Sequence, residues 1–453
     1  MRVYQNAIEM IGKTPMLQLH RFDTGPCELF LKLEYANPGG SIKDRIGLSM
    51  IEQAEKRGEL KPGGTIVEAT AGNTGLGLAL VAAQKGYRLI LVLPDKMSQE
   101  KIFNLRAMGA EVVLTRSDVA KGHPEYYQDL GAAIAERTGA YFINQFGNPD
   151  NPKAHAETTG PEIWEQMSQR LDAIVLGVGS SGTIGGLAAF FKKTAPHVEL
   201  VLADPQGSIL AEYIATGKMT QKGSWLVEGI GEDFIPTICD FSLTKRAYSI
   251  PDAESFSVAR ELLQKEAILA GSSTGTLLAG ALRFCREQKT PKRVVTFACD
   301  TGARYLSKLY NDFWMEDQGF IERERFGDLR DLVGRPHGVR ATITVGPDDV
   351  LTTAHNRLRN AGFSQLPVMS DDNLIGIITE DDILRFAFGR PERFKEPVRN
   401  AMTATFLRVD KALSVNNLVA MLEVCASAAV MDGDKFYGLI TRSDVLNYLR
   451  RQV

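Results

Sequence analysis

The chain has 453 residues, of which 44% are hydrophobic and 24% charged, and its formal net charge at pH 7 is −3. This composition is typical of a globular, water-soluble protein of about three domains, and it argues against a nucleic-acid or membrane-surface partner. The amino terminus lacks a signal peptide's apolar core, no apolar run reaches membrane-spanning length and the five scattered cysteines contain no C-x-x-C pair, which predicts a cytoplasmic protein with reduced thiols and no metal site.

Short apolar or β-branched runs alternate with helical stretches from residue 29 to about residue 312. The runs that we expect to form strands are 29–33, 65–67, 89–93, 111–114, 173–176, 200–203 and 294–298. This alternation predicts an α/β fold with parallel sheets covered by helices. Glycine-rich segments lie where strands pass into helices, which is where open α/β sheets bind ligands.

The first candidate site is the segment 37–45, which follows the strand expected at 29–33. A Pro-Gly-Gly turn leads into a helix that begins near Lys43, where a cation opposes the helix dipole. Lysine forms Schiff bases with carbonyl cofactors once burial lowers its pKa. Lys43 is therefore our candidate for a covalent cofactor link, and the alternative is a solvated lysine in a first helical turn.

A polar turn follows the next expected strand, at residues 70–77. Gly72 allows a tight turn, and Thr70, Asn73 and Thr74 offer polar side chains beside the N–H groups of a helix N-terminus. Such an arrangement binds a carboxylate. Taken alone, the same residues are also compatible with an ordinary strand-to-helix turn.

A glycine-rich loop spans residues 177–186, directly after the strand expected at 173–176. It has no P-loop lysine, and no acidic residue lies on a matching second strand, so a nucleoside triphosphate or a dinucleotide fits poorly. A compact phosphate monoester fits better, because glycines let the backbone approach an anion and hydroxyls add donors. The residues that we expect around this phosphate are Gly179, Ser180, Ser181, Gly182 and Thr183.

A fourth segment, 270–276, contains Ser273, whose hydroxyl is suited to hydrogen-bond a heteroaromatic nitrogen. The alternative is that Ser273 or Thr274 caps a helix. A reactive lysine, a phosphate loop and a ring-nitrogen partner together predict pyridoxal 5'-phosphate (PLP) as the cofactor.

The composition changes at residues 318–335, which are rich in charged residues, glycine and proline and are predicted to be a linker or a solvated helix. An internal repeat follows, since 374–384 parallels 436–446 and Gly376 and Gly438 lie 62 positions apart. Each copy is predicted to form a buried strand, a capping threonine and a helix with aspartate in its first turn. The predicted copies are 336–391 and 392–453, related by pseudo-twofold symmetry.

The four segments, in this order, resemble those of the fold-type II PLP enzymes of the cysteine synthase/cystathionine β-synthase group. The resemblance covers about residues 5–315 and includes Gly12-Lys13-Thr14-Pro15 and the run from 148 to 164. The repeat is similar to a CBS-domain pair. The segment 227–236 and the added pair resemble cystathionine β-synthases more than plain cysteine synthases.

The resemblance implies two open twisted α/β lobes in a catalytic domain at 1–317, with a mobile lobe at about 44–145 that closes over substrate. Lys43 would be the Schiff-base lysine and the general base, Asn73 would contact the ring hydroxyl oxygen and Ser273 would face the pyridine nitrogen. Gly229 would leave room for substrate. The substrate α-carboxylate would be held by Thr70, Gly72, Asn73, Thr74 and Gln145. Three residues depart from the pattern of the group, namely Ala71, Ser181 and Phe146.

The resemblance also implies the reaction, a β-replacement that joins L-serine or an activated serine to L-homocysteine and gives cystathionine in transsulfuration. Hydrogen sulfide release from cysteine plus homocysteine would be a side reaction. One alternative is a cysteine synthase that uses O-acetylserine and sulfide, and another is a nucleotide-sensing module on a degenerate catalytic body. A neutral Ser273 at the ring nitrogen would favour β-elimination over transamination.

We expect no haem, because the segment at 12–15 begins almost at the first residue and leaves no room for a haem-binding extension. Thr379 and Asp382, and likewise Thr441 and Asp444, match the T-x-x-D pattern with which CBS domains bind the ribose of adenosyl effectors. Each pair also fits a capped helix start. The group further implies a homodimer or higher homo-oligomer.

Overall fold

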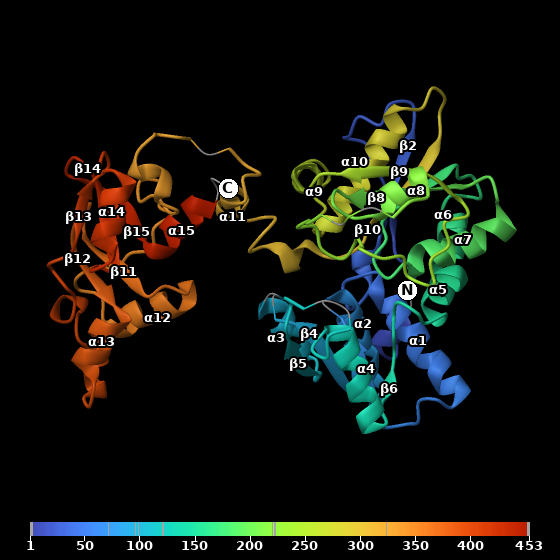
Figure 1. The fold of residues 1–453 in the computed structure, drawn as a ribbon, viewed down its shortest axis with the longest axis horizontal. Helices are drawn as coiled ribbons and strands as arrows, with labels where there is room; N and C mark the ends of the chain where they lie inside the picture. The colour runs from blue at the N-terminus through green and yellow to red at the C-terminus, as the bar shows by residue number, and fades with distance from the viewer. Residues whose placement is uncertain are drawn as a thin grey trace. The chain divides into compact units, whose positions relative to one another are not determined.

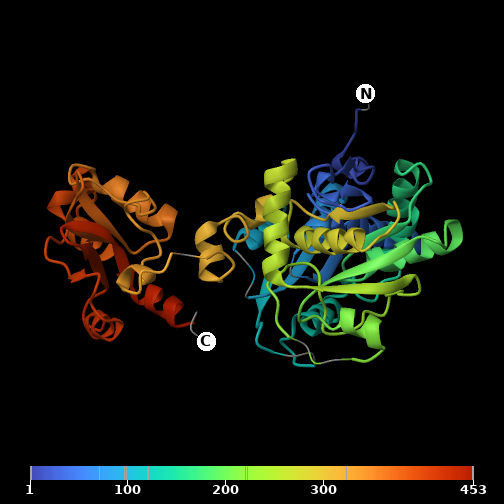
Figure 2. The same ribbon diagram turned by 90° about the horizontal axis from the view of Figure 1, so that it is seen from above.

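The computed structural model describes residues 3–70, 72–95, 97, 99–119, 122–219, 221, 223–322 and 324–450. Two compact units divide the chain after Tyr310, and each is built of sheets flanked by helices (Figure 1; Figure 2). The predicted domain boundary at 317 lies a few residues later than this division. Within the described residues, no helix is both long and apolar enough to span a membrane.

The larger sheet of the first unit has the strand order β1-β2-β10-β7-β8-β9, with all neighbours parallel except β1 and β2. Its strands are β1 (Met16–Gln18), β2 (Glu28–Leu33), β7 (Ala173–Leu176), β8 (Glu199–Pro205), β9 (Thr244–Ile250) and β10 (Arg293–Ala298). The four residues of β7 are all buried, as expected for a central strand with helices on both faces. The parallel α/β prediction is confirmed.

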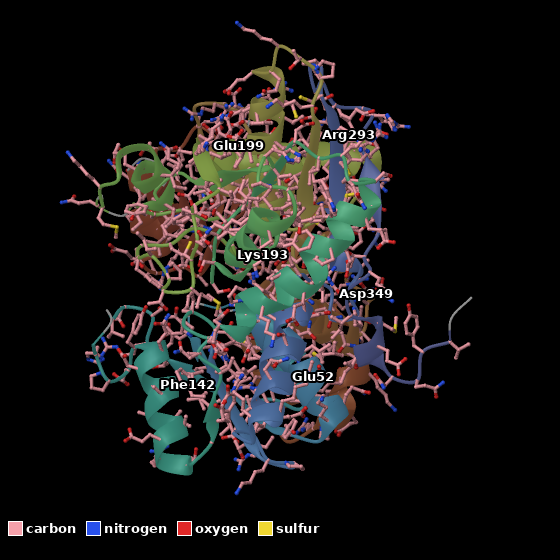
Figure 3. The ribbon with its side chains drawn as sticks, turned by 90° about the vertical axis from the view of Figure 1, so that its right-hand side faces the viewer. Glu52, Phe142, Lys193, Glu199, Arg293 and Asp349 are labelled. Atoms are coloured by element: carbon pink, nitrogen blue, oxygen red, sulfur yellow. The ribbon has the colours of Figure 1, made fainter. Side chains whose placement is uncertain are left out.

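A second sheet of the first unit has the order β5-β4-β3-β6 and is parallel throughout. Its strands are β3 (Thr65–Ala69), β4 (Arg88–Pro94), β5 (Glu111–Thr115) and β6 (Tyr141–Phe142). Figure 3 shows the two lobes of this unit, with Glu52 and Phe142 in one and Glu199 and Arg293 in the other. Each sheet contributes to an apolar core of its own.

The helices of the first unit cover these sheets, and several begin directly at a strand's carboxyl end. They are α1 (Lys43–Arg57), α2 (Asn73–Lys85), α3 (Gln99–Ala107), α4 (Tyr127–Thr138), α5 (Asp150–Ala154), α6 (Gly160–Gln166), α7 (Gly182–Thr194), α8 (Leu210–Thr216), α9 (Asp252–Glu266) and α10 (Ser272–Arg286). The shorter turns are η1 (Ala7–Met10), η2 (Glu34–Ala36), the π-helical η3 (His155–Thr159) and η4 (Gly302–Tyr305).

Helices α1 and α2 touch through their backbones at two glycines. A Cβ atom on Gly47 would lie 2.7 Å from the carbonyl carbon of Gly77, and a Cβ atom on Gly77 would lie 2.6 Å from the carbonyl oxygen of Lys43. Since any side chain would separate the helices, glycine is required at both positions. The contact brings the starts of the two helices, Lys43 and Asn73, close together.

A buried network of charges fixes the first turn of α1. The Arg45 guanidinium donates to Glu34 at 2.7 Å and to Glu162 at 2.7 Å, and the Lys32 amine lies 3.0 Å from Glu162. Lys32 and Glu34 have no exposed surface. The network joins β2, α1 and α6 two residues away from Lys43.

The second unit contains α11 (Asp312–Asp317), η5 (Leu329–Leu332) and two similar halves. The first half has α12 (Leu351–Ala361), β11 (Gln365–Ser370), β12 (Asn373–Thr379), α13 (Glu380–Ala387), η6 (Pro391–Lys395) and η7 (Val398–Asn400). The second has β13 (Arg408–Asp410), α14 (Val415–Leu422), β14 (Ser427–Asp432), β15 (Lys435–Thr441) and α15 (Arg442–Arg450). The register of each antiparallel hairpin shifts at equivalent points, Val368/Met369 and Val430/Met431, as the repeat predicts.

The packing within the second unit shifts the predicted boundaries of its parts. Leu329, Leu332 and Val333 fall in the predicted linker, yet they are buried in one core with Leu418 of the second half. Val398 lies in the predicted second copy, 392–453, and is buried in the core of the first half. The predicted boundaries differ from the packing because the residues next to these buried apolar side chains are charged, which gives the segments a linker-like composition.

Candidate active site

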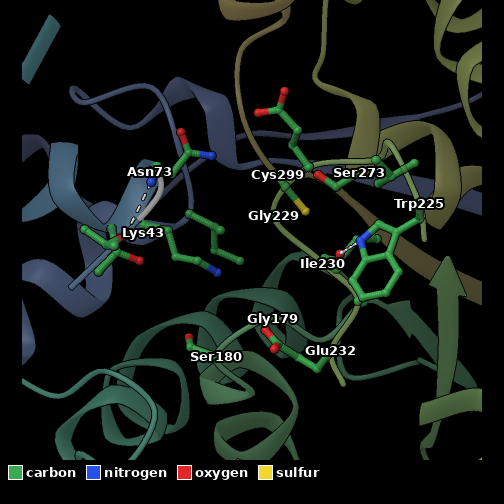
Figure 4. Close-up of a pocket in the computed structure, with 18 of the residues that line it drawn as sticks. Lys43, Asn73, Gly179, Ser180, Trp225, Gly229, Ile230, Glu232, Ser273 and Cys299 are labelled. Carbon is green, nitrogen blue, oxygen red and sulfur yellow. Dashed lines mark hydrogen bonds between the residues drawn. The ribbon is translucent and has the colours of Figure 1, made fainter. Parts of the chain in front are cut away.

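One cavity of about 700 Å³ in the first unit collects the residues that the four sequence segments predicted (Figure 4). Its wall includes Lys43, Thr70, Gly72, Asn73, Thr74, Gln145, Gly179, Ser180, Ser181, Gly182, Thr183, Gly229 and Ser273. The cavity lies where β-strands end and the following helices begin, as expected for ligand sites of open α/β sheets. Ala71 lies outside the described residues, and Phe146 also lines the wall.

Lys43 is the first residue of α1, and its half-buried side chain lines the cavity (Figure 4). Burial lowers the pKa of its amine, although Asp300 and Glu232 partly counteract the effect. A lowered pKa leaves more of the amine neutral at physiological pH, which is the form that attacks a carbonyl group. A cavity-lining position and a lowered pKa favour the cofactor-linked lysine over a solvated first-turn lysine.

The phosphate loop joins β7 to the N-terminus of α7, whose N–H groups favour an anion. A Cβ atom on Gly182 would lie 1.7 Å from Asn151 Oδ1, and one on Gly179 would lie 2.6 Å from the Gly229 carbonyl oxygen. Ser181 has a φ of 64°, the left-handed conformation that glycine adopts without cost. The loop thus keeps a glycine-like backbone at this departure from the group's pattern, and its residues fit a compact phosphate.

The carboxylate turn is connected to the core through Gln145. The Thr74 hydroxyl donates to Gln145 Oε1 at 2.7 Å, and Gln145 Nε2 donates to Glu68 Oε1 at 3.1 Å. Glu68 is buried on β3, and this burial raises its pKa to about 8. Its second oxygen has no hydrogen-bond partner among the described residues. Glu68 therefore orients the Gln145 amide while itself remaining protonated at neutral pH.

Glu68→Gln should make the protein more stable at pH 8 than the wild type, with little difference near pH 5. The unfolded chain releases this proton near pH 4.5, whereas the folded chain keeps it to about pH 8. The folded state of the wild type therefore loses relative stability as pH rises between these values, at ~1.4 kcal/mol per pKa unit. Chemical unfolding at both pH values tests this, with the exposed Glu136→Gln as control. Equal effects at both pH values would contradict it.

Asn73 is held by residues that follow β10. Its Nδ2 atom donates to Asp300 at 2.8 Å, Arg304 donates to its Oδ1 atom, and the Tyr305 hydroxyl donates to Asp300 at 2.7 Å. These contacts fix the amide orientation and leave one N–H of Asn73 for a ligand. Asp300, Arg304 and Tyr305 were not predicted from the sequence, although polar residues after a strand's carboxyl end are a usable signal.

The N-terminus of α10 is not capped by a side chain. Gly271 is the N-cap residue, and no side chain accepts a capping hydrogen bond there. The Ser272 hydroxyl accepts from the Glu228 backbone N–H at 3.0 Å, and the Thr274 hydroxyl accepts from that of Cys299 at 3.2 Å. The capping alternative for Ser273 and Thr274 is therefore wrong, and Ser273 faces the cavity.

A cationic cluster that the sequence analysis missed lies on the cavity wall. Lys308 Nζ lies 2.8 Å from Glu228 Oε1, and Lys101 contacts the other oxygen of the same carboxylate. Together the two lysines hold the pKa of Glu228 below its usual value despite burial. One carboxylate between two ammonium groups leaves a net positive charge that suits an anionic substrate group. No group of three His, Cys, Asp or Glu side chains suited to a metal occurs within the described ranges.

In the second unit, both T-x-x-D pairs adopt the geometry of helix starts. The Thr379 hydroxyl accepts from the Asp382 N–H at 3.1 Å, and Asp382 accepts from the Thr379 N–H at 2.9 Å. The Thr441 N–H likewise donates to Asp444 at 2.7 Å. These residues therefore cap their helices, and the binding of an adenosyl effector to the same residues remains a proposal.

The family model for pyridoxal-phosphate dependent enzymes matches residues 8–300, which include the four cavity segments. The chain belongs to the pyridoxal-phosphate dependent enzymes. A model for the CBS domain matches residues 338–389 of this PLP-dependent enzyme. Both matches agree with the resemblance found in the sequence.

Among the known proteins similar to this PLP-dependent enzyme, one covers both units and two cover about the catalytic unit alone. A cystathionine β-synthase from Dictyostelium discoideum is 34% identical and the alignment covers 99% of this chain and 93% of that protein. Cysteine synthase A from Escherichia coli is 39% identical over 70% of this chain and 98% of its own length. The solved O-acetylserine dependent cystathionine β-synthase from Helicobacter pylori is 36% identical with a TM-score of 0.63, covering 68% of this chain and 99% of that one. Within its family, this chain belongs to the cystathionine β-synthase group.

Proposed function

We propose that this enzyme joins L-serine, or an activated serine, to L-homocysteine by β-replacement and so forms cystathionine in transsulfuration. The observation that carries the proposal is the similarity to cystathionine β-synthases along 99% of the chain. Release of hydrogen sulfide from cysteine plus homocysteine is the proposed side reaction. It is supported by the solved hydrogen sulfide-producing enzyme from Fusobacterium nucleatum, which is 36% identical over 67% of this chain and all of that one, with a TM-score of 0.62.

In this proposal, bound PLP supplies the electron sink for chemistry at the substrate carbons. The loop before α7 would hold its phosphate, Asn73 its ring oxygen and Ser273 its pyridine nitrogen. Lys43 would carry the cofactor between turnovers and move the Cα proton during them. Its half-buried amine at the start of α1 supports that role.

The substrate carboxylates would bind at two places on the wall. The α-carboxylate of the donor amino acid would lie on the turn at 70–74 and on Gln145, whose amide is already oriented by Thr74 and Glu68. An anionic end of the acceptor thiol would lie near Lys101 and Lys308, where positive charge exceeds the charge of Glu228. Both sites place charge-assisted hydrogen bonds at fixed positions.

A steady-state assay with matched acceptors tests the reaction. We expect serine plus homocysteine to give cystathionine, identified by mass, with a higher kcat/KM than O-acetylserine plus sulfide gives for cysteine. The reverse order would favour the second candidate, a cysteine synthase, which the 39% identity to cysteine synthase A supports over the catalytic unit. No turnover with either pair, despite bound PLP, would favour a sensing module on an inactive body.

The CBS module is proposed to bind an adenosyl effector, supported by the two T-x-x-D pairs at equivalent helix starts. Calorimetry of the full chain with S-adenosylmethionine, AMP and ATP tests this. Heat from none of them would leave the module as an assembly element. We further propose a cytoplasmic homodimer or higher homo-oligomer without haem. Light scattering gives its mass, and a haem absorbance band in the purified protein would contradict that part.

A further inference from the structure

Glu232 lies on the cavity wall together with Lys43, on a loop whose backbone is tightly held (Figure 4). Its N–H donates to the Ser208 hydroxyl at 3.1 Å, and its carbonyl oxygen accepts from that hydroxyl and from the Ile209 N–H, both at 3.1 Å. Three hydrogen bonds therefore anchor the point from which the side chain extends.

A tryptophan shapes the same loop just before Glu232. The Trp225 indole N–H donates to the Ile230 carbonyl oxygen at 3.1 Å, as Figure 4 shows. A Cβ atom on Gly231 would lie 2.8 Å from the Trp225 ring, and Gly231 has a φ of 90°, which favours glycine. The indole thus fixes the turn that directs Glu232 into the cavity.

The Glu232 carboxyl group is unlike the other acids of this wall, since it has no hydrogen-bond or ion-pair partner among the described residues. Glu228 in contrast is held by two lysines. Burial raises the pKa of Glu232 well above its usual value, and Asp233 and Asp204 raise it further, whereas Lys43 lowers it. The raised pKa favours the protonated form of a carboxyl group that lines the cavity.

An unactivated serine needs such a proton. When its Cβ–O bond breaks, the electron pair leaves with oxygen, and hydroxide is a poor leaving group unless it is protonated in the same step. Lys43 already takes up the Cα proton at this stage. A separate acid would supply this proton and leave Lys43 to return its own proton to Cα, and Glu232 lines the same cavity as Lys43 from a different element (Figure 4).

We propose that Glu232 is the catalytic acid that protonates the departing β-hydroxyl, which makes unactivated L-serine the donor. This inference rests on the proposed β-replacement. The Cα–H and Cβ–O bonds break and a Cα=Cβ double bond forms; the Cα proton goes to Lys43, the Glu232 proton goes to oxygen, and water leaves. The acceptor thiol then forms an S–Cβ bond, gives its proton to the Glu232 carboxylate, and Lys43 returns its proton to Cα. Serine and thiol thus become thioether and water, with both residues restored.

The test compares two donors that differ in their need for an acid. Stopped-flow absorbance of the bound cofactor, recorded without thiol, reports the first half-reaction of the holoenzyme alone. Glu232→Gln should slow this step about 100-fold with L-serine, but less than threefold with β-chloro-L-alanine, whose chloride leaves without a proton. The matched control, Glu212→Gln, removes an exposed carboxylate on the neighbouring α8 and should change neither rate.

Three outcomes separate the inference from the function on which it rests. Equal slowing with both donors, at unchanged cofactor content, would overturn the role of Glu232 alone and leave it a binding residue. An unchanged serine rate in Glu232→Gln would also overturn it. If the wild-type enzyme does not eliminate water from L-serine but does convert O-acetylserine and sulfide, the proposed function itself is overturned.

The pH profile adds a readout that a merely structural role would not move. Because the acid form of Glu232 is needed, the wild-type first-step rate with L-serine should fall as pH rises through its raised pKa. The charged and titratable groups around it are Asp233, Asp204, Lys43 and the phenols of Tyr126 and Tyr127. With β-chloro-L-alanine, the first-step rate should not fall over the same pH range. If the rate falls with this donor too, another group is titrating and the proposal fails.

Discussion

Lys43→Ala protein is expected to lack the visible absorbance of a lysine-bound pyridoxal cofactor and to lose at least about 10³-fold of turnover. The half-buried amine at the start of α1 faces the cavity with a lowered pKa. Among the described residues of the cavity wall, the other two lysines, Lys101 and Lys308, are both paired with Glu228. The covalent link and the proton transfer are therefore lost together.

The experiment combines an absorbance scan with borohydride trapping and peptide mass mapping of the wild type. The reduced cofactor should be found on Lys43. Lys56→Ala changes an exposed lysine in the last turn of the same helix and should keep both absorbance and turnover. A yellow, active Lys43→Ala protein, or a label on another residue, would refute the assignment.

Arg45→Ala is expected to lower the free energy of unfolding of the catalytic unit by about 3–5 kcal/mol. The substitution leaves the fully buried Glu34 carboxylate without its main partner and removes the guanidinium from Glu162. Breaking a buried pair on one side is costly because the remaining charge stays out of water.

The matched control is Arg88→Ala, which removes a pair of similar length, 2.6 Å to Glu111, between side chains that are 64% and 50% exposed. Its expected cost is about 0–1 kcal/mol. Urea unfolding followed by tryptophan fluorescence measures both, since Trp164 lies on the same helix, α6, as Glu162. Similar losses for the two variants would show that burial of the network adds nothing.

Local patterns were sufficient for most of the catalytic fold and for most of the predicted residues that line the cavity, whereas Gln145 and Gly229 followed only from the resemblance. The central strands are continuous apolar runs, and the turns that follow them carry the glycines and hydroxyls of the cavity, so each signal lies within about ten residues of sequence. Strand β9 was missed because its residues are mostly polar or only partly buried at the sheet edge.

Residues whose role depends on distant partners could not be predicted in this way. Glu68 lies within an apolar strand, and only the fold brings Gln145 to it. Asp300 and Arg304 act on Asn73 across more than 200 residues of sequence. In the second unit, Leu329 looks like part of a charged linker until its burial against the second half is known.

The glycine contact between α1 and α2 has a consequence for how the enzyme would close. Because Gly47 and Gly77 allow no gap between the two backbones, the lysine and the asparagine that start these helices must travel as one rigid piece. A rotation of the proposed mobile lobe would then change their separation from the phosphate loop and leave their mutual spacing intact. The Gly77→Ala substitution would force the two helices apart and so change the spacing between Lys43 and Asn73.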